Sequence, residues 1–156
     1  SIPVNGQFTD RQRAVYNAVH RVLKEARSLL VPGNTLEELN KEVGKVMESE
    51  LLGLGLISKD DIEKQDKEKP AYKKYFMHGT SHHLGLDVHD LMNRYEPFRA
   101  GMVFTCEPGI YIPEESLGIR IENNILITDN GPVDMFENIP LDAEEIEDMM
   151  HAGVLN

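Results

Sequence analysis

The chain has 156 residues, of which 40% are hydrophobic and 28% charged, a composition typical of a single globular domain with its own hydrophobic core. Its formal net charge of −11 argues against nucleic-acid binding, because a net negative protein repels the phosphate backbone. The sequence has neither an apolar run long enough for a membrane span nor the basic-then-apolar pattern of a signal peptide. We therefore expect no membrane association. The single cysteine, Cys106, cannot form an internal disulfide, which suits a reducing environment, so we expect a cytoplasmic location.

The chain begins with a short segment that precedes a helix. Residues 1–8 read as a short extended piece, in which Pro3 suits an edge strand and Asn5-Gly6 is a turn pair. Thr9, followed three residues later by Gln12, has the form of a helix capping box. Apolar residues then recur at helical spacing as far as Leu30, so the first helix should cover this stretch.

A second helix follows after a short turn. Thr35 and Glu38 form another capping box, and the apolar stripe behind it runs to about Leu51. Residues 58–74 are dense in charges of both signs, which is typical of a solvated surface segment.

Strands are predicted in the second half of the chain. Residues 102–107 read as a strand that ends at Pro108-Gly109, and the proline biases the residue before it towards extended backbone. Residues 118–128 alternate most clearly, with isoleucines on one face and Arg120 and Glu122 on the other, as in a single strand.

Two further predictions concern the core and the end of the chain. The alternation in residues 102–107 points the Cys106 side chain away from that of Glu107, so we expect a buried, unreactive thiol. Asp142 followed by Glu145 indicates the start of a final helix that runs through Met150.

Histidines are concentrated in one stretch, between residues 78 and 90. Four of the six histidines lie there: His78, His82, His83 and His89. Imidazole binds divalent metals and transfers protons near neutral pH, and interleaved leucine and valine make a solvated, tag-like tract a poor explanation. The stretch is therefore a candidate functional site.

Carboxylates on the two predicted strands could complete this site. Glu107 and Glu122 could lie on neighbouring strands and face the same side as His82, and a carboxylate–imidazole set suits Mn, Co or Zn. Arg120 lies two residues before Glu122 and could hold either that carboxylate or an acidic group of a substrate. Strand periodicity alone allows an ordinary alternative, in which Arg120 and Glu122 form an ion pair on a solvated sheet face and Glu107 is an acidic strand end.

These residues occur in three blocks that resemble a known family. The chain resembles the C-terminal catalytic domain of the Xaa-Pro aminopeptidases (aminopeptidase P), which belong to the pita-bread metallopeptidases together with prolidase and methionine aminopeptidase. The blocks occur in the same order as in the family and at similar spacing. They are His78-Gly79-Thr80-Ser81-His82, with Gly85-Leu86-Asp87-Val88-His89-Asp90 behind it, then Glu107-Pro108-Gly109-Ile110-Tyr111 and Gly118-Ile119-Arg120-Ile121-Glu122-Asn123.

The resemblance implies a fold, a reaction and a metal site. The fold would be α+β, a partial pita-bread (creatinase/aminopeptidase) fold with a curved antiparallel sheet and flanking helices. The reaction would be hydrolysis of the bond between an N-terminal residue and a following proline, by a hydroxide that two divalent ions activate. Those ions would be Mn in the first place, with Co or Zn as alternatives. Their ligands would include His82, Glu107 and Glu122.

The resemblance also implies roles for the surrounding side chains. Glu107 would act as general base in addition to binding metal. His78 and His89 would lie close to the substrate and stabilise the tetrahedral oxyanion. Arg120 would orient Glu122 or the substrate, and Tyr111 would line the substrate site. His83 is left without a role.

The chain departs from the family pattern in one respect. The family's dinuclear site also uses two aspartates on strands that precede the first helix, and Asp10, at the predicted helix start, does not match either of them. We therefore expect residues 1–156 to be the C-terminal portion of the catalytic domain, a fragment with weak or absent metal binding and little activity of its own. The parent protein would cleave peptides with proline in the second position and is expected to form homo-oligomers.

Two other functions remain compatible with the same residues. Prolidase, which cleaves Xaa-Pro dipeptides, shares the three blocks. A pita-bread module that has lost catalysis and only binds peptides or proteins is the second alternative, although such a module would be expected to lose the ligand residues that this chain retains.

Overall fold

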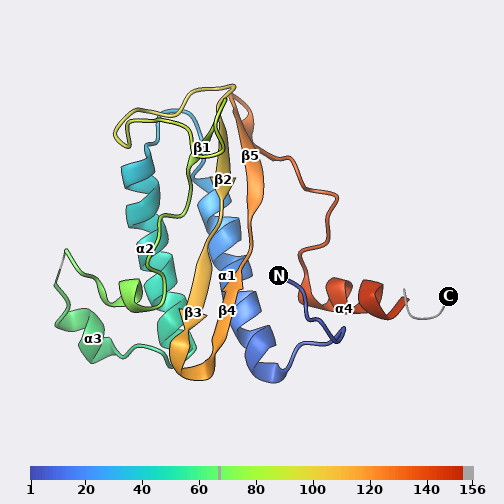
Figure 1. Ribbon diagram of the computed structural model, residues 1–156. Coiled ribbons are helices and arrows are strands. Elements are labelled where there is room, and N and C mark those ends of the chain that lie inside the picture. The colour runs from blue at the N-terminus through green and yellow to red at the C-terminus, as the bar shows by residue number, and fades with distance from the viewer. Residues whose placement is uncertain (67, 153–156) are drawn as a thin grey trace.

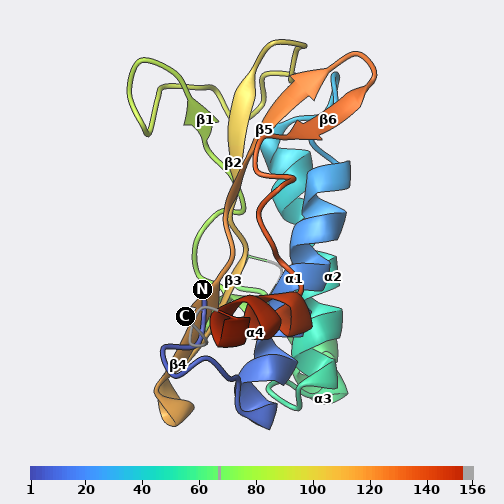
Figure 2. The ribbon, with the colours of Figure 1, turned by 90° about the vertical axis from the view of Figure 1, so that its right-hand side faces the viewer.

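The computed structural model of the chain describes residues 1–66 and 68–152 and consists of a layer of strands with helices packed against one face (Figures 1 and 2). The helices are α1 (Asp10–Ser28), α2 (Leu36–Gly53), α3 (Lys59–Glu63), η1 (Ala71–Lys74), η2 (Pro113–Glu115) and α4 (Ala143–Ala152). The strands are β1 (His83–Leu84), β2 (Val103–Cys106), β3 (Gly109–Ile112), β4 (Leu117–Arg120), β5 (Asn123–Thr128) and β6 (Gly131–Asp134).

Two long helices, α1 and α2, form the layer behind the strands (Figure 2). Both capping boxes are confirmed: the Thr9 hydroxyl accepts from the N–H of Gln12 at 3.2 Å, and the Thr35 hydroxyl accepts from the N–H of Glu38 at 3.1 Å. These bonds satisfy backbone donors that the first helical turn leaves free. The apolar stripe of α1 packs towards the strands and is fully buried at Val15, Val19 and Val22, among others. None of the helices in the described ranges combines the length and the apolar character needed to cross a membrane.

The strands form two antiparallel sheets. The larger sheet has the order β1-β2-β5-β6, and the smaller one pairs β3 with β4. In the larger sheet Cys106 lies opposite Asn123, and in the smaller one Gly109 lies opposite Arg120. The chain passes from β2 to β3 and back from β4 to β5, so the two sheets continue one another along a single antiparallel path (Figure 1).

The prediction of one strand over residues 118–128 is wrong, because the pairing is interrupted at Ile121-Glu122. Opposite Ile121, Pro108 has no N–H to donate, although its carbonyl still accepts the N–H of Ile121 at 3.3 Å. The ladder between β2 and β5 therefore stops there and resumes between β3 and β4. The alternation of burial continues through the interruption, and the four isoleucines of the stretch are all buried: Ile119, Ile121, Ile125 and Ile127.

The expected edge strand in residues 1–8 does not form. The predicted turn at Asn5-Gly6 does form: Gly6 has a positive φ of 82° and donates its N–H to the carbonyl of Pro3 at 3.1 Å. The Phe8 N–H bonds to the carboxylate of Glu147 in α4 at 2.7 Å, which ties the segment to the final helix. That helix is confirmed, and Asp142 caps it by accepting the N–H of Glu144 at 3.0 Å.

The Cys106 side chain points into the core between the strands and α1, as predicted. It is 0% exposed, and its sulfur lies 3.8 Å from the carbonyl oxygen of Leu23. Burial raises the pKa of the Cys106 thiol to about 12, because the thiolate would lose its hydration. The thiol therefore stays protonated at neutral pH, and its hydrogen-bond partner, the Leu23 carbonyl, can only accept its proton and so does not activate it.

We predict that Cys106 is inert towards thiol reagents in the folded protein. At pH 8 the reaction with a disulfide reagent should be limited by unfolding, whereas the urea-denatured chain should react at the rate of a free cysteine, because only the thiolate attacks. The absorbance of the released thiolate measures both rates. Rapid labelling of the native chain would contradict the burial of this side chain.

Candidate active site

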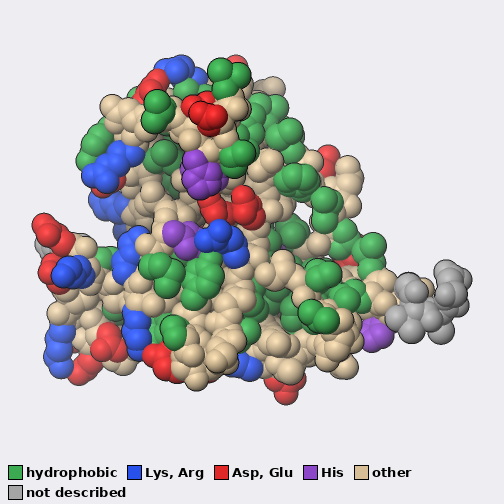
Figure 3. All heavy atoms as spheres, viewed as in Figure 1, with side chains coloured by type: hydrophobic (Ala, Val, Ile, Leu, Met, Phe, Trp, Pro, Cys, Tyr) green, Lys and Arg blue, Asp and Glu red, His purple; other side chains and the backbone are tan. Residues whose placement is uncertain are grey.

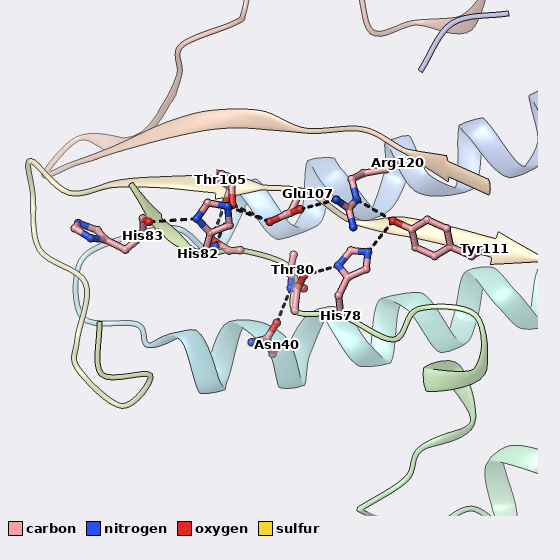
Figure 4. Close-up of polar contacts among 11 residues, drawn as sticks. Asn40, His78, Thr80, His82, His83, Thr105, Glu107, Tyr111 and Arg120 are labelled. Carbon is pink, nitrogen blue, oxygen red and sulfur yellow. Dashed lines mark hydrogen bonds and ion pairs between the residues drawn. The ribbon is translucent and has the colours of Figure 1, made fainter. Parts of the chain in front are cut away.

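Side chains with acid–base and metal-binding character gather on the face of the strand layer that the long helices leave uncovered. Figure 3 shows histidine, acidic and basic side chains side by side in the middle of this face. Figure 4 shows that they project from the ends of the strands and from the segment that leads into β1.

Three of the predicted residues come together there. His82, Glu107 and Glu122 each offer one potential ligand atom, and these atoms all lie within 4.8 Å of one another. The two carboxylates meet because β2 and β5 are antiparallel: Cys106 lies opposite Asn123, so the residues just outside this pair also face each other. His82 joins them because its carbonyl accepts the N–H of Thr105 at 3.0 Å, alongside β2.

The imidazole of His82 is held with one nitrogen available to a metal. Its Nδ1 lies 3.2 Å from the carbonyl oxygen of His83, and a carbonyl can only accept, so Nδ1 carries the proton. The lone pair of the neutral ring is then on Nε2, which lies 3.5 Å from Oε1 of Glu107. A backbone carbonyl that fixes the tautomer in this way is the usual support of a metal-binding histidine.

The donor set fits a divalent cation. The side chains of His82 and Glu107 are 22% and 13% exposed, so both are partly withdrawn from water. One imidazole and two carboxylates suit an ion of the Mn, Co or Zn type, and a cation between them would relieve the repulsion of the carboxylates. These three residues could hold such an ion and leave further coordination positions open.

Arg120 contacts Glu107 in the structure. Its Nη1 lies 3.3 Å from Oε2 of Glu107, and this is the ion pair that Arg120 makes within the described residues. The ordinary alternative, an ion pair between Arg120 and Glu122 on a solvated sheet face, is therefore not what the structure contains. Glu107 is thus the common neighbour in the site: Glu122 and His82 lie beside it as potential ligands, and Arg120 forms an ion pair with it.

A hydrogen-bonded chain links Arg120 to His78 through Tyr111 (Figure 4). Arg120 Nε donates to the Tyr111 hydroxyl at 2.8 Å, and that hydroxyl lies 2.8 Å from Nε2 of His78. His78 Nδ1 faces the carbonyl of Gly79 at 2.8 Å and so carries the proton, which leaves Nε2 to accept from the tyrosine. Two of the side chains that were predicted to lie near the substrate, His78 and Tyr111, thus connect to Glu107 through Arg120.

His89 lies on the other side of the group. Its ring centroid is 4.2 Å from that of His82, with the planes tilted by 35°. The loop that carries it is organised around Asp90, whose carboxylate accepts the N–H groups of Leu86 and Leu91, each at 2.8 Å. The bond from Leu91 holds the pKa of Asp90 below its usual range. All seven predicted site residues therefore lie on this face.

Two contributors to the site were not predicted from the sequence. Asn40, on α2, accepts the N–H of Thr80 through its side-chain oxygen at 2.8 Å and so anchors the histidine-bearing segment to a helix far away in the sequence. Thr105, on β2, contacts both His82 and Glu107. Thr105 could have been predicted, because it lies two residues before Glu107 and strand alternation places both side chains on the same face. No local sequence pattern identifies Asn40.

The chain is similar in sequence and structure to known aminopeptidases. The chain is 38% identical to an Xaa-Pro aminopeptidase of Haemophilus influenzae over 97% of its length, and 40% identical to an Xaa-Pro aminopeptidase of Escherichia coli over 98%. It spans 37% of the length of each of these relatives. The zinc-substituted E. coli aminopeptidase P in complex with product matches with a TM-score of 0.86 and 39% identity, over 97% of this chain and 37% of that one.

The match extends to fold and family. The similarity to aminopeptidase P, together with antiparallel sheets flanked by helices, confirms the expected α+β pita-bread fold. The sequence model of metallopeptidase family M24 matches residues 1–129, a range that contains every predicted site residue. The chain therefore belongs to metallopeptidase family M24.

Proposed function

We propose that residues 1–156 are the C-terminal portion of the catalytic domain of an aminopeptidase that removes an N-terminal residue preceding proline. The observation that carries this proposal is the convergence of His82, Glu107 and Glu122 within 4.8 Å, in a chain of a metallopeptidase family. The identity of 40% to an Xaa-Pro aminopeptidase supports the choice of substrate. Because the chain spans 37% of that relative, the activity is proposed for the protein that contains the rest of such a domain.

The proposed ligands are His82, Glu107 and Glu122. Two divalent ions are proposed for the complete site, with Mn first and Co or Zn as alternatives, and the remaining ligands would come from outside these 156 residues. When bound, the ions would lower the pKa of a water molecule and polarise the scissile carbonyl. Glu107 would take up the proton from that water as general base. Its second oxygen, Oε2, is already held by Arg120, which limits the rotation of the carboxylate.

The residues around the ligands would bind the substrate. His78 and His89 lie on two sides of the three ligand residues and would stabilise the oxyanion that forms on the scissile carbonyl; for His78 this requires that Nε2 carry a proton and turn from the Tyr111 hydroxyl to the substrate. Tyr111 and Arg120 hold His78 in place and would line the pocket for the proline-containing peptide.

Two alternatives differ in substrate or in chemistry. Prolidase would use the same residues on Xaa-Pro dipeptides. A binding module without catalysis is disfavoured, because the three ligand side chains are present and converge. We further propose a cytoplasmic location, which the single buried cysteine supports, and a homo-oligomeric parent protein.

A peptidase assay with Mn tests the proposed reaction. An Xaa-Pro-Xaa peptide should be cleaved before proline by a version of the chain extended at its N-terminus to the length of the relatives, and only weakly by the 156-residue chain. E107Q in the extended version should lower kcat at least about 100-fold, because it removes a ligand and the general base.

The matched control for E107Q is E114Q, which changes an exposed glutamate at the far end of the β3–β4 hairpin and should leave activity unchanged. Liquid chromatography of the released amino acid measures the rate. Cleavage of Xaa-Pro dipeptides alone would favour prolidase. Equal activity in the long and short chains would contradict the proposal that further ligands lie outside residues 1–156.

Calorimetry with Mn tests the metal site separately from catalysis. The 156-residue chain should bind at most one ion and bind it weakly, because it supplies three protein ligands. Both E107Q and E122Q should abolish the binding heat. Tight binding of two Mn ions by this short chain would show that the ligand set is already complete.

Gly109→Ala tests the role of Tyr111. A Cβ at position 109 would lie 2.7 Å from the Tyr111 hydroxyl oxygen, so the flexible end of the tyrosine must move and lose its contacts to His78 and Arg120. We expect kcat of the extended version to fall about 10- to 100-fold with little loss of stability, since displacements of this size misplace catalytic groups. Gly53→Ala, where nothing lies within 4 Å, is the matched control. An unchanged kcat would show that the contacts of Tyr111 with His78 and Arg120 do not contribute to catalysis.

A further inference from the structure

The hydroxyl of Thr105 lies between two of the proposed metal ligands. Thr105 is on β2 and is 2% exposed. Its Oγ1 accepts the backbone N–H of His82 at 3.0 Å and lies 3.2 Å from Oε1 of Glu107. Figure 4 shows the threonine between the histidine and the glutamate, with both contacts drawn.

The hydrogen-bonding capacity of a hydroxyl fixes the direction of both bonds. A threonine hydroxyl has one proton to donate and lone pairs to accept with. The His82 N–H can only donate, so Oγ1 accepts from it, and the single proton is free for the carboxylate of Glu107. The carboxylate is then held at both oxygens, by Thr105 at Oε1 and by Arg120 at Oε2.

The main chain of Thr105 holds the same segment from the other side. Its N–H donates to the carbonyl of His82 at 3.0 Å, and its carbonyl accepts the hydroxyl of Ser81. Backbone and side chain of one residue therefore tie the histidine-bearing segment to β2, while the hydroxyl sets the direction of the glutamate two residues further along.

We propose that Thr105 is a positioning residue that pre-orients His82 and Glu107 for the metal, a role that rests on the proposed function of these two side chains. It does not touch substrate or metal and acts through the two ligands. Partners of this kind are worth about 10- to 100-fold in metal affinity. The ordinary alternative is that Thr105 only fills space in the sheet, and substitutions that separate the hydroxyl from the methyl group distinguish the two.

The test compares T105V, which removes the hydroxyl and keeps the shape, with T105S, which keeps the hydroxyl. In the extended version of the chain, T105V should lower Mn affinity about 10- to 100-fold by calorimetry, and T105S should restore it to near the wild-type value. Thr80→Val is the matched control, because Thr80 is equally buried and its hydroxyl has no hydrogen-bond partner in the part of the chain that the structure describes. It should leave the affinity unchanged.

A second readout needs no metal. In the 156-residue chain, hydrogen exchange at the His82 amide should accelerate in T105V and return to the wild-type rate in T105S, while the Thr105 amide stays protected in both. If T105V does not fold, T105C takes its place with the same expected direction, since a thiol of similar size is a weaker partner.

The outcomes are distinct. Failure of the wild-type protein to bind Mn in any form would refute the proposed function, and the exchange rates would still decide whether Thr105 holds His82. Unchanged affinity and exchange in T105V, or equal losses in T105V and T80V, would overturn the positioning role.

Discussion

The register between β2 and β5 is the constraint on which the candidate active site depends. Cys106 lies opposite Asn123, so the next residue on one strand and the preceding residue on the other, Glu107 and Glu122, face each other at the sheet end. A shift by one residue would turn one of these carboxylates towards the helices. The buried neighbours oppose such a shift, because Cys106 would leave the core if β2 shifted, and Ile125 if β5 shifted.

The same register brings compensating groups next to the two carboxylates, Glu107 and Glu122, which repel each other. Two carboxylates close together repel each other, and the structure supplies His82, Arg120 and Thr105 as compensating contacts. Thr105 lies on β2, Arg120 on β4 just before β5, and His82 on the segment that leads into β1. His82, Glu107, Glu122, Arg120 and Thr105 therefore form one polar unit on the strand layer.

Much of this arrangement could be predicted from local patterns. The capping boxes at Thr9 and Thr35 and the apolar spacing behind them located α1 and α2, because these signals act within a few residues. The alternation in residues 118–128 correctly assigned the buried face. It could not by itself reveal the break at Ile121-Glu122, because that break comes from the missing N–H of Pro108 on the partner strand, and the pairing of these two segments joins residues distant in sequence. Asn40 was missed for the same reason.

The one-sided placement of the long helices has a practical consequence. The candidate ligands face away from the helix layer, whereas exposed positions such as Arg21 and Lys24 lie on α1. Probes or surface anchors attached to the exposed side of α1 would leave the candidate ligands on the opposite face accessible. Orientation on a sensor chip or a fluorescence readout of ion uptake could thus be engineered through α1 without altering any residue that contacts His82, Glu107 or Glu122.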